Sequence, residues 1–515
     1  MKSKLLEFLK QDSVIIILLV LTAFLVRAYF LSNNAVLFFY DQARDAIISR
    51  SIIENGDLKI QGPSSSGSND LLYHGVLYYY IISPFYVLSK GNPHFVSLIS
   101  GFLNALTIIP LYLLALRMFS RKLVAVFSCL LFIFSTHSIH AGVWLSNPTL
   151  VPLFVTSFYY FLWRVVADKK FTYIPLVFLF LGLSNQAFLY TIYLWISIFV
   201  AGVLLIQERD PRWILLRQTL IGFVVYMISI GTMILAELRL VKTGLLNFAS
   251  LSGFSESERP LFSTLSIARE AYSYGIKVAI FPNQLTFGLI LLVISLLFLL
   301  KATRYTRIVI GMWLLSPLIM ELITPRNDKH TLLGVTVVFY IIIAFALVHL
   351  LKTYAGKIAV IIILAAFLKI NIDYSLYTKD VRISLFGIQR GAQLQDQLDL
   401  IDYTYLKANS RPFTISTYTN PYNINTTWAY LYYWYGATKY GYIPEYYGSD
   451  QAGRHGDTLM KLNPQYGDIH FTVYEPLEGL PGDFELEFAE IQTLQVRPVT
   501  EKKEFKILKL ESRIK

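Results

Sequence analysis

The sequence predicts a mainly α-helical protein that crosses a membrane many times, carries interfacial helices in its first outer loop and ends in a small C-terminal α/β domain. Of the 515 residues, 55% are hydrophobic and only 15% are charged, whereas about a quarter of the residues of soluble domains are charged. Apolar runs such as 13 to 31 and 281 to 300 have the length, about 20 residues, that a helix needs to cross a bilayer. The residues after 372 are polar and rich in tyrosine instead.

Hydropathy predicts about eleven membrane spans. Their approximate limits are 13 to 31, 95 to 116, 123 to 140, 148 to 165, 172 to 188, 190 to 206, 213 to 236, 285 to 300, 306 to 323, 331 to 351 and 357 to 372. The first run lacks a clear small-residue cleavage site, so we expect a retained span and not a signal peptide. Arg27, near the end of that span, is expected to reach outward to the interface.

Lysine and arginine indicate the orientation of the spans. With the N-terminus in the cytoplasm, basic clusters such as 117 to 122 and 301 to 307 lie inside, and the outer loop 141 to 147 has no lysine or arginine. The outer turn 324 to 330 is basic. Counting the apolar run 75 to 89 as a span would invert this pattern. We therefore interpret that run, which contains Pro84, as a half-inserted or interfacial segment.

These assignments divide the chain into two predicted domains. Residues 1 to 372 form a transmembrane domain, with 32 to 94 as its first outer loop, and residues 373 to 515 form a domain outside the membrane. In the second domain, 413 to 418 and 469 to 474 are strand-like and 392 to 406 is helical. We expect a bacterial or archaeal plasma membrane, because eukaryotic retention signals are missing.

Composition also excludes some classes of function. The net charge of +11 comes mostly from cations between apolar runs, which indicates membrane topology and not nucleic-acid binding. The single cysteine, Cys129, lies in an apolar run, so we expect neither a disulfide framework nor a cysteine metal site.

Ionisable side chains gather at the predicted outer ends of the helices and not in their middles. Interior polar residues such as Asn104, Asn185 and Gln186 are neutral, and hydrogen bonds between helices account for them. This pattern disfavours an ion-coupled transporter and suits a reaction at the outer interface. The outer group comprises Asp41, Arg44, Asp45, Asp70, His74, Glu237, Arg239, Glu321, Arg326, Lys329 and His330.

The first outer loop holds the most informative stretch. If residues 41 to 54 are helical, Asp41 and Asp45 lie on one stripe with Arg44 beside them. Two interpretations of Asp41 follow. It is either an N-cap that accepts hydrogen bonds from the first turn or a reactive carboxylate at the mouth of a cavity.

Two motifs of this loop resemble those of the GT-C glycosyltransferases, in the branch that contains protein O-mannosyltransferases and lipid A aminoarabinose transferases. They are Asp41-Gln42-Ala43-Arg44-Asp45-Ala46 and Tyr73-His74-Gly75-Val76-Leu77-Tyr78-Tyr79. The resemblance places Asp41 at the family's essential carboxylate and His74 where some relatives have a phosphate-binding lysine. It also places the turn 324 to 330 opposite the carrier phosphate. Gln42 stands where the family usually has a second acid, and Gly75-Val76 stand where it has prolines.

The resemblance implies a glycosyltransferase that uses a polyprenyl-phosphate sugar. Asp41 would be the general base for an acceptor hydroxyl of a glycan, lipid or protein, in an inverting displacement, and Asp45 would orient Arg44 or the acceptor. Arg326, Lys329, His330, His74 and Arg44 would offset charge on the leaving phosphate. The other cavity candidates are Asp70, Tyr73, Tyr78, Glu237 and Glu321. We expect transfer without a metal, although relatives that glycosylate asparagine use a divalent cation.

Several alternatives stay open at this point. His74 is a phosphate ligand or an ordinary loop residue, and Tyr78, Tyr79 and Tyr80 stack on sugar or anchor the loop at the membrane surface. Residues 420 to 428 and 430 to 435 hold a glycan or cover a small core. A flippase for lipid-linked sugars and a non-catalytic glycan-binding scaffold are the rival functions.

Overall fold

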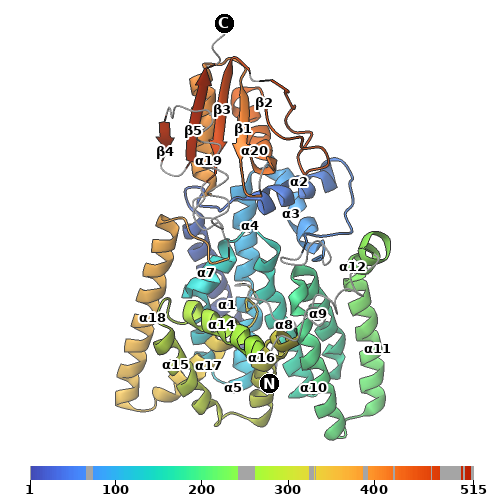
Figure 1. Cartoon of the computed structure of the whole chain (residues 1–515). Helices are drawn as coiled ribbons and strands as arrows, with labels where there is room; N and C mark the ends of the chain where they lie inside the picture. The colour runs from blue at the N-terminus through green and yellow to red at the C-terminus, as the bar shows by residue number, and fades with distance from the viewer. Residues whose placement is uncertain are drawn as a thin grey trace.

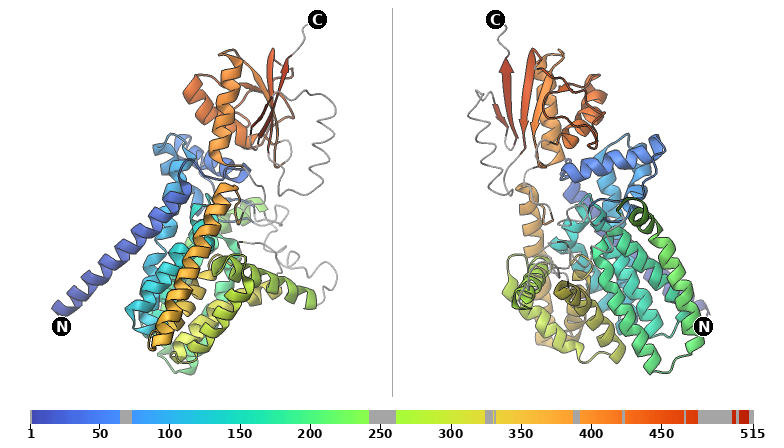
Figure 2. Two further views of the ribbon diagram at one scale, coloured as in Figure 1. Left: turned by 90° about the vertical axis from the view of Figure 1, so that its left-hand side faces the viewer. Right: turned by 45° about the vertical axis from the view of Figure 1, so that its right-hand side comes forward.

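A computed structural model gives the structure of the chain and describes residues 2–64, 73–241, 261–323, 330, 332–386, 392–421, 424–465, 467–475, 500–502 and 505–511. A bundle of helices carries a smaller domain with a β-sheet at one end (Figure 1). The N-terminal end of α1 lies at the opposite end of the bundle (Figure 2).

Each predicted span coincides with a helix or a pair of helices. These are α1 (Lys2–Leu31), α4 (Pro93–Ala105) with α5 (Ile108–Phe119), α6 (Lys122–Phe134) with α7 (Thr136–Val143), η1 (Asn147–Leu150) with α8 (Val151–Val166), η2 (Phe171–Tyr173) with α9 (Ile174–Ala187), η3 (Leu189–Tyr193) with α10 (Leu194–Gln207), α11 (Arg212–Ser229) with α12 (Gly231–Ala236), α15 (Leu285–Leu299), α16 (Arg304–Ile323), α17 (Thr336–Leu350) and α18 (Tyr354–Asp380). Two pairs are bent, α6 against α7 by 62° and α11 against the segment after it by 58°.

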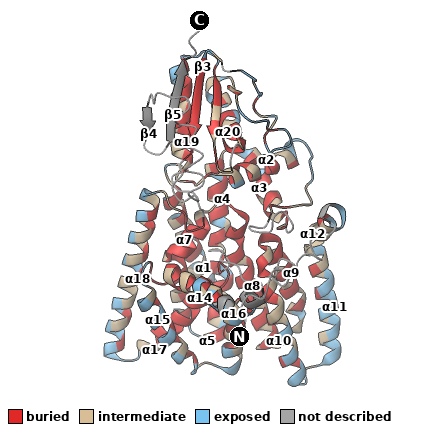
Figure 3. Ribbon diagram, viewed as in Figure 1, coloured by how far each residue is buried: buried red, intermediate tan, exposed pale blue. Residues whose placement is uncertain are grey.

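The described helices have the length and composition of a multi-pass membrane protein. Five of them are long and apolar enough to cross a bilayer, or seven if each bent pair is one span, and further apolar helices such as α15 and α17 are shorter. The residues of α17 from Thr336 to Val348 are buried on all sides, whereas α11, α15 and α18 expose apolar side chains along their outer faces (Figure 3). Such exposed apolar faces suit contact with lipid.

Arg27 does not reach outward, so that prediction is wrong. Its side chain is fully buried and donates to Oδ1 of Asn104 at 3.1 Å, to the carbonyl of Ala23 at 3.0 Å and to that of Ser138 at 3.4 Å. The guanidinium also lies over the ring of Phe132. Acceptors on neighbouring helices satisfy the cation inside the bundle, and Arg27 thereby ties α1 to α4 and α7.

Three further helices are not spans. In the segment 32 to 94, predicted as the first outer loop, α2 (Tyr40–Glu54) packs on α3 (Leu77–Leu88), and both lie between the bundle and the smaller domain (Figure 1). With 12 residues, α3 is too short to cross a bilayer, in agreement with the interpretation of this run. The sequence did not predict α14 (Leu261–Ala279), which lies across the bundle and not along it (Figures 1 and 2).

The C-terminal domain is a five-stranded mixed sheet with helices. Its strands are β1 (Thr414–Tyr418), β2 (Glu445–Tyr446), β3 (Ile469–Tyr474), β4 (Thr500–Lys502) and β5 (Phe505–Glu511), in the order β2-β1-β3-β5-β4. β1 pairs in parallel with β2 and β3, and β5 runs antiparallel to β3 and β4. The helical segments are α19 (Leu394–Ala408), α20 (Thr426–Leu431), η6 (Tyr432–Gly436) and α21 (Ala437–Tyr440). The α/β class predicted for the tail is confirmed.

Backbone hydrogen bonds join the start of the first outer loop to the start of the C-terminal domain. Phe38 donates to the carbonyl of Ala392 at 3.1 Å, and Leu394 donates to the carbonyl of Val36 at 2.8 Å. The side chain of Gln397 donates to the carbonyl of Phe38. These contacts fix the residues that lead directly into α2.

Candidate active site

The first turn of α2 places Asp41 at the junction of the two domains. Phe39 is the N-cap residue, and its amide donates to Oε1 of Gln42 at 3.0 Å. Nε2 of Gln42 donates to the carbonyl of Leu145 at 3.1 Å, which fixes α2 to the loop after α7. Asp41 is therefore not the N-cap, and the capping interpretation is wrong. It lies in the first turn, where the helix dipole favours a carboxylate.

Arg44 joins the two carboxylates of this helix. Its Nη1 lies 2.6 Å from Oδ1 of Asp41, and its Nη2 lies 2.7 Å from Oδ1 of Asp45. Nε also donates to Asp45, at 3.0 Å. The Asp41 side chain is 63% exposed, whereas that of Asp45 is 3% exposed. Asp41 is thus accessible to a substrate, and the buried Asp45 holds Arg44 in place.

Burial dominates the electrostatics of the inner pair. Burial raises the pKa of Asp45 to about 6, although the guanidinium of Arg44 opposes the rise. Burial by itself would lower the pKa of Arg44, but Asp45 and Asp41 raise that pKa well above its ordinary value. Tyr79 lies beside this pair on α3. Arg44 is consequently a permanent cation held between one exposed and one buried acid.

His74 holds the first outer loop against the membrane domain. The side chain is buried, and its Nδ1 accepts a hydrogen bond from the amide of Leu189 at 3.1 Å. In the neutral ring the proton therefore resides on Nε2. The next residue, Gly75, donates its amide to the carbonyl of Gln186 at 3.0 Å. His74 lies in the loop before α3, and its phosphate contact through Nε2 stays a prediction.

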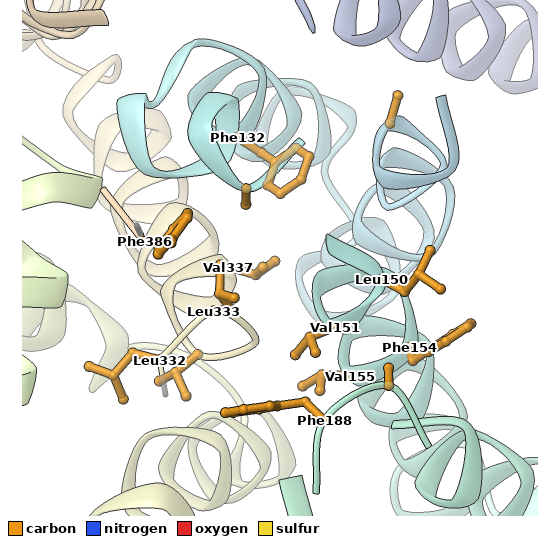
Figure 4. Packing of buried hydrophobic residues seen from close by; sticks show 14 of the residues in the cluster. Phe132, Leu150, Val151, Phe154, Val155, Phe188, Leu332, Leu333, Val337 and Phe386 are labelled. Carbon is orange, nitrogen blue, oxygen red and sulfur yellow. The ribbon is translucent and has the colours of Figure 1, made fainter. Parts of the chain in front are cut away.

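A row of rings links the two histidines to the start of α2. The ring centroid of Phe188 lies 5.3 Å from that of His74 and 5.1 Å from that of His330. The ring of Trp144 lies 5.7 Å from that of His330, and the next residue along the chain is Leu145, which binds Gln42. Figure 4 shows Phe188 among the apolar side chains of this part of the bundle. The fold thus brings His330 close to the two motifs predicted around Asp41 and His74.

The other predicted site residues lie elsewhere in the fold or outside the described part of the structure. Tyr78 is buried in the core, and its hydroxyl lies 3.4 Å from Oγ of Ser100, so its assignment to a substrate cavity is wrong. Tyr73 pairs with Ser64 in an isolated bridge, and Glu237 begins η4 (Glu237–Val241) after α12. Glu321 belongs to α16, but its side chain lies outside the described part of the structure. Asp70, Arg326 and Lys329 also lie outside the described residues.

The aromatic patch of the tail is mostly core. Trp428, Tyr430 and Tyr432 are fully buried, which confirms the structural interpretation for these three residues. Tyr433 is 37% exposed, and the guanidinium of Arg50 lies 5.4 Å from its ring centroid. The loop 454 to 459 of the C-terminal domain faces α2, and neither this loop nor Arg50 was predicted from the sequence. Only the folded chain brings these two segments together.

Within the described residues, there is no group of three or more histidine, cysteine, aspartate or glutamate side chains that could hold a metal ion. Metal-independent transfer therefore stays a prediction.

Comparison with known proteins identifies the fold. No protein-family model matches the chain, and no curated protein sequence does. Among solved structures the chain is similar, over nearly its whole length, to proteins with the GT-C fold, and the chain has this fold.

Two of the similar structures are crystal structures of ArnT from Cupriavidus metallidurans. The one bound to undecaprenyl phosphate is 14% identical, with a TM-score of 0.57 over 96% of this chain and 97% of that chain. The apo structure is 12% identical, with a TM-score of 0.55 over 97% of this chain and 98% of that chain. Because the match spans both chains, it includes the C-terminal domain as well as the helical bundle.

Proposed function

We propose that this chain is a membrane glycosyltransferase that transfers a sugar from a polyprenyl-phosphate carrier to an acceptor hydroxyl at the outer face of the membrane. The observation that carries the proposal is the cluster of Asp41, Arg44 and Asp45 at the junction of the two domains. The whole-chain similarity to an ArnT structure that holds undecaprenyl phosphate supports the choice of carrier. The fold alone fixes no activity, so the cluster is the basis of the mechanism.

In this mechanism Asp41 is the general base. The acceptor oxygen attacks the anomeric carbon, its proton passes to the Asp41 carboxylate, and the bond from the anomeric carbon to the phosphate oxygen breaks. The phosphate leaves with the bonding electrons, and a single displacement inverts the anomeric centre. The exposure of Asp41 suits this role, because a general base must come within hydrogen-bond distance of the acceptor.

Arg44 offsets charge on the leaving phosphate. Two of its nitrogens stay on Asp45, while Nη1 exchanges its contact with Asp41 for a phosphate oxygen. The exchange frees Asp41 to accept the proton at the moment when the phosphate needs a cation. In the same proposal His74, His330, Arg326 and Lys329 contribute further positive or donor groups at the carrier phosphate.

The test uses the purified full-length protein in liposomes with radiolabelled polyprenyl-phosphate sugars. Asp41→Asn should lower transfer by about 100-fold or more, the size of an acid-base contribution. Asp373→Asn is the matched control, because Asp373 is an exposed acid paired with Lys369 on α18. Near-normal turnover by Asp41→Asn would refute the role of Asp41. Passage of the labelled lipid across the bilayer without bond cleavage would instead identify a flippase.

A further inference from the structure

A polar cleft lies between α2 and the C-terminal domain. It has a volume of about 410 Å³ and is lined by the last turns of α2, the residues that follow α2, Tyr433 of η6 and the loop 454 to 459. This volume is in the range of small-molecule sites, about 300–1,000 Å³. The mechanism proposed above uses none of these residues, so the cleft needs an explanation of its own.

The charges that line the cleft cancel. Three of its side chains are cations and three are acids: Arg50, Lys59, Arg454, Glu54, Asp57 and Asp457. Arg50 is paired with Glu54 at 3.0 Å, and Lys59 is paired with Asp57. A site for a phosphate needs an excess of positive charge, and a site for a lipid tail needs apolar walls. A lining of balanced donors and acceptors suits a neutral ligand that has many hydroxyl groups.

Tyr433 adds a planar surface to this lining. It is partly exposed, although its neighbours Tyr430 and Tyr432 are buried. The guanidinium of Arg50 packs on its ring, which restricts the motion of both side chains. An aromatic ring beside fixed hydrogen-bonding groups offers one contact to the apolar face of a sugar ring and others to its hydroxyls.

The cleft adjoins the proposed catalytic cluster. Arg50 follows Arg44 on the same helix, about 9 Å along its axis at 1.5 Å per residue. His455, which lines the cleft, has a pKa lowered by partial burial and by the nearby cations Arg44 and Lys59. Arg44 in turn contacts Asp41. The lining residue of α2 nearest to Asp41 along the chain is Ile47, six residues or about 9 Å of helix from the proposed base.

We propose that this cleft binds the acceptor and that the acceptor is a neutral oligosaccharide. The proposal rests on the transferase function proposed above and narrows its acceptor from a glycan, lipid or protein to a carbohydrate. The sugar chain lies along α2, held by Tyr433 and the paired charges, and its terminal hydroxyl points toward Asp41.

The test measures binding separately from transfer. Purified full-length protein is titrated with neutral tri- to pentasaccharides of glucose, mannose and N-acetylglucosamine, and binding is followed by saturation-transfer NMR. Tyr433→Ala and Arg454→Gln should each weaken binding about tenfold or more. Tyr354→Ala is the matched control, because Tyr354 is 81% exposed at the start of α18 and does not line the cleft. Hydrolysis of a polyprenyl-phosphate sugar by water, in the absence of acceptor, should stay within twofold of wild type in the control variant Tyr354→Ala.

The outcomes separate the two proposals. Binding that the cleft variants lose and the control keeps supports the cleft. The cleft proposal is wrong, and the transferase proposal stands, if the wild-type protein turns over the donor but binds no neutral oligosaccharide. The same conclusion follows if wild type and all variants bind the oligosaccharide equally. If the oligosaccharide binds in the cleft but no donor is ever turned over, the transferase proposal is wrong. A variant that unfolds during the titration is replaced by the other, since Tyr433 and Arg454 belong to different segments.

Discussion

We predict that Gly75→Ala detaches the first outer loop from the end of α9. A Cβ atom at this position would lie 1.8 Å from Oε1 of Gln186 and 2.7 Å from its Cα, where ordinary contacts begin at 3.4 Å. The Gln186 side chain is not free to move, because its Nε2 donates to the carbonyl of Ser229 and to Oγ1 of Thr232. With the side chain held in place, α9 must retreat by about 1.6 Å for Oε1 to reach an ordinary contact distance, and overpacking of this kind costs about 1–3 kcal/mol.

The chain offers its own reporter for this loss of stability. Cys129 is the only cysteine and is buried in α6, so a thiol-reactive fluorescent dye labels it when the bundle opens on heating. Gly75→Ala should lower the midpoint of labelling. Gly202→Ala in α10 is the matched control, because its added Cβ meets no atom within 4 Å. Removal of a helical glycine there should raise stability by up to about 1 kcal/mol.

The same variant tests the position of His74. Movement of α9 separates the amide of Leu189 from Nδ1 of His74, so transfer should also fall. A midpoint for Gly75→Ala equal to or above that of wild type, with Gly202→Ala behaving as expected, would show that the contact between Gly75 and Gln186 is not close in the folded protein.

Three further predictions concern buried charge and metal. Arg27→Lys should lower the labelling midpoint of Cys129, because one ammonium cannot replace the guanidinium contacts that join α1 to α4 and α7; an unchanged midpoint would contradict this account. Burial raises the pKa of Asp45 from 3.8 to about 6, so the folded protein binds this proton more tightly than the unfolded chain. The contribution of Asp45 to the free energy of unfolding is therefore complete below pH 3.8 and is lost as the pH rises through 6. Asp45→Asn cannot ionise and should flatten that part of the curve of midpoint against pH, whereas identical curves for variant and wild type would refute the pKa. Transfer should continue in the presence of a chelator such as EDTA, and complete loss that a divalent cation restores would show that the reaction needs a metal.

Local sequence patterns predicted most elements of the fold. The stretch 41 to 54, whose acids and isoleucines share one stripe if it is helical, is a helix from Tyr40 to Glu54 in the structure. Alternation and β-branched residues gave the strands at 413 to 418 and 469 to 474. The helix α14 was missed because Arg269, Glu270 and Lys277 interrupt its apolar residues and lower the mean hydropathy of any window across it.

Burial and long-range contacts were not predictable in the same way. Arg27 was expected to extend outward, because nothing near it in sequence shows that acceptors on α4 and α7 surround it. Tyr78 and Tyr79 have the composition of an interfacial belt, but the packing of α3 on its neighbours buries both. The cleft joins residues about 400 positions apart in the chain, and a single sequence carries no periodicity over such a distance.

The backbone pairing of residues 36 to 38 with 392 to 394 has a consequence for biosynthesis. The segment that orients the acid-bearing helix finds its partners only after more than three hundred further residues have left the ribosome. A nascent chain, or one truncated by a premature stop codon before residue 392, contains Asp41, Arg44 and Asp45. It lacks the carbonyl and amide groups that fix the residues leading into α2. The C-terminal part of the polypeptide, which is synthesised last, thus completes the site in the N-terminal part. In a truncated product the acid-bearing helix lacks these backbone contacts.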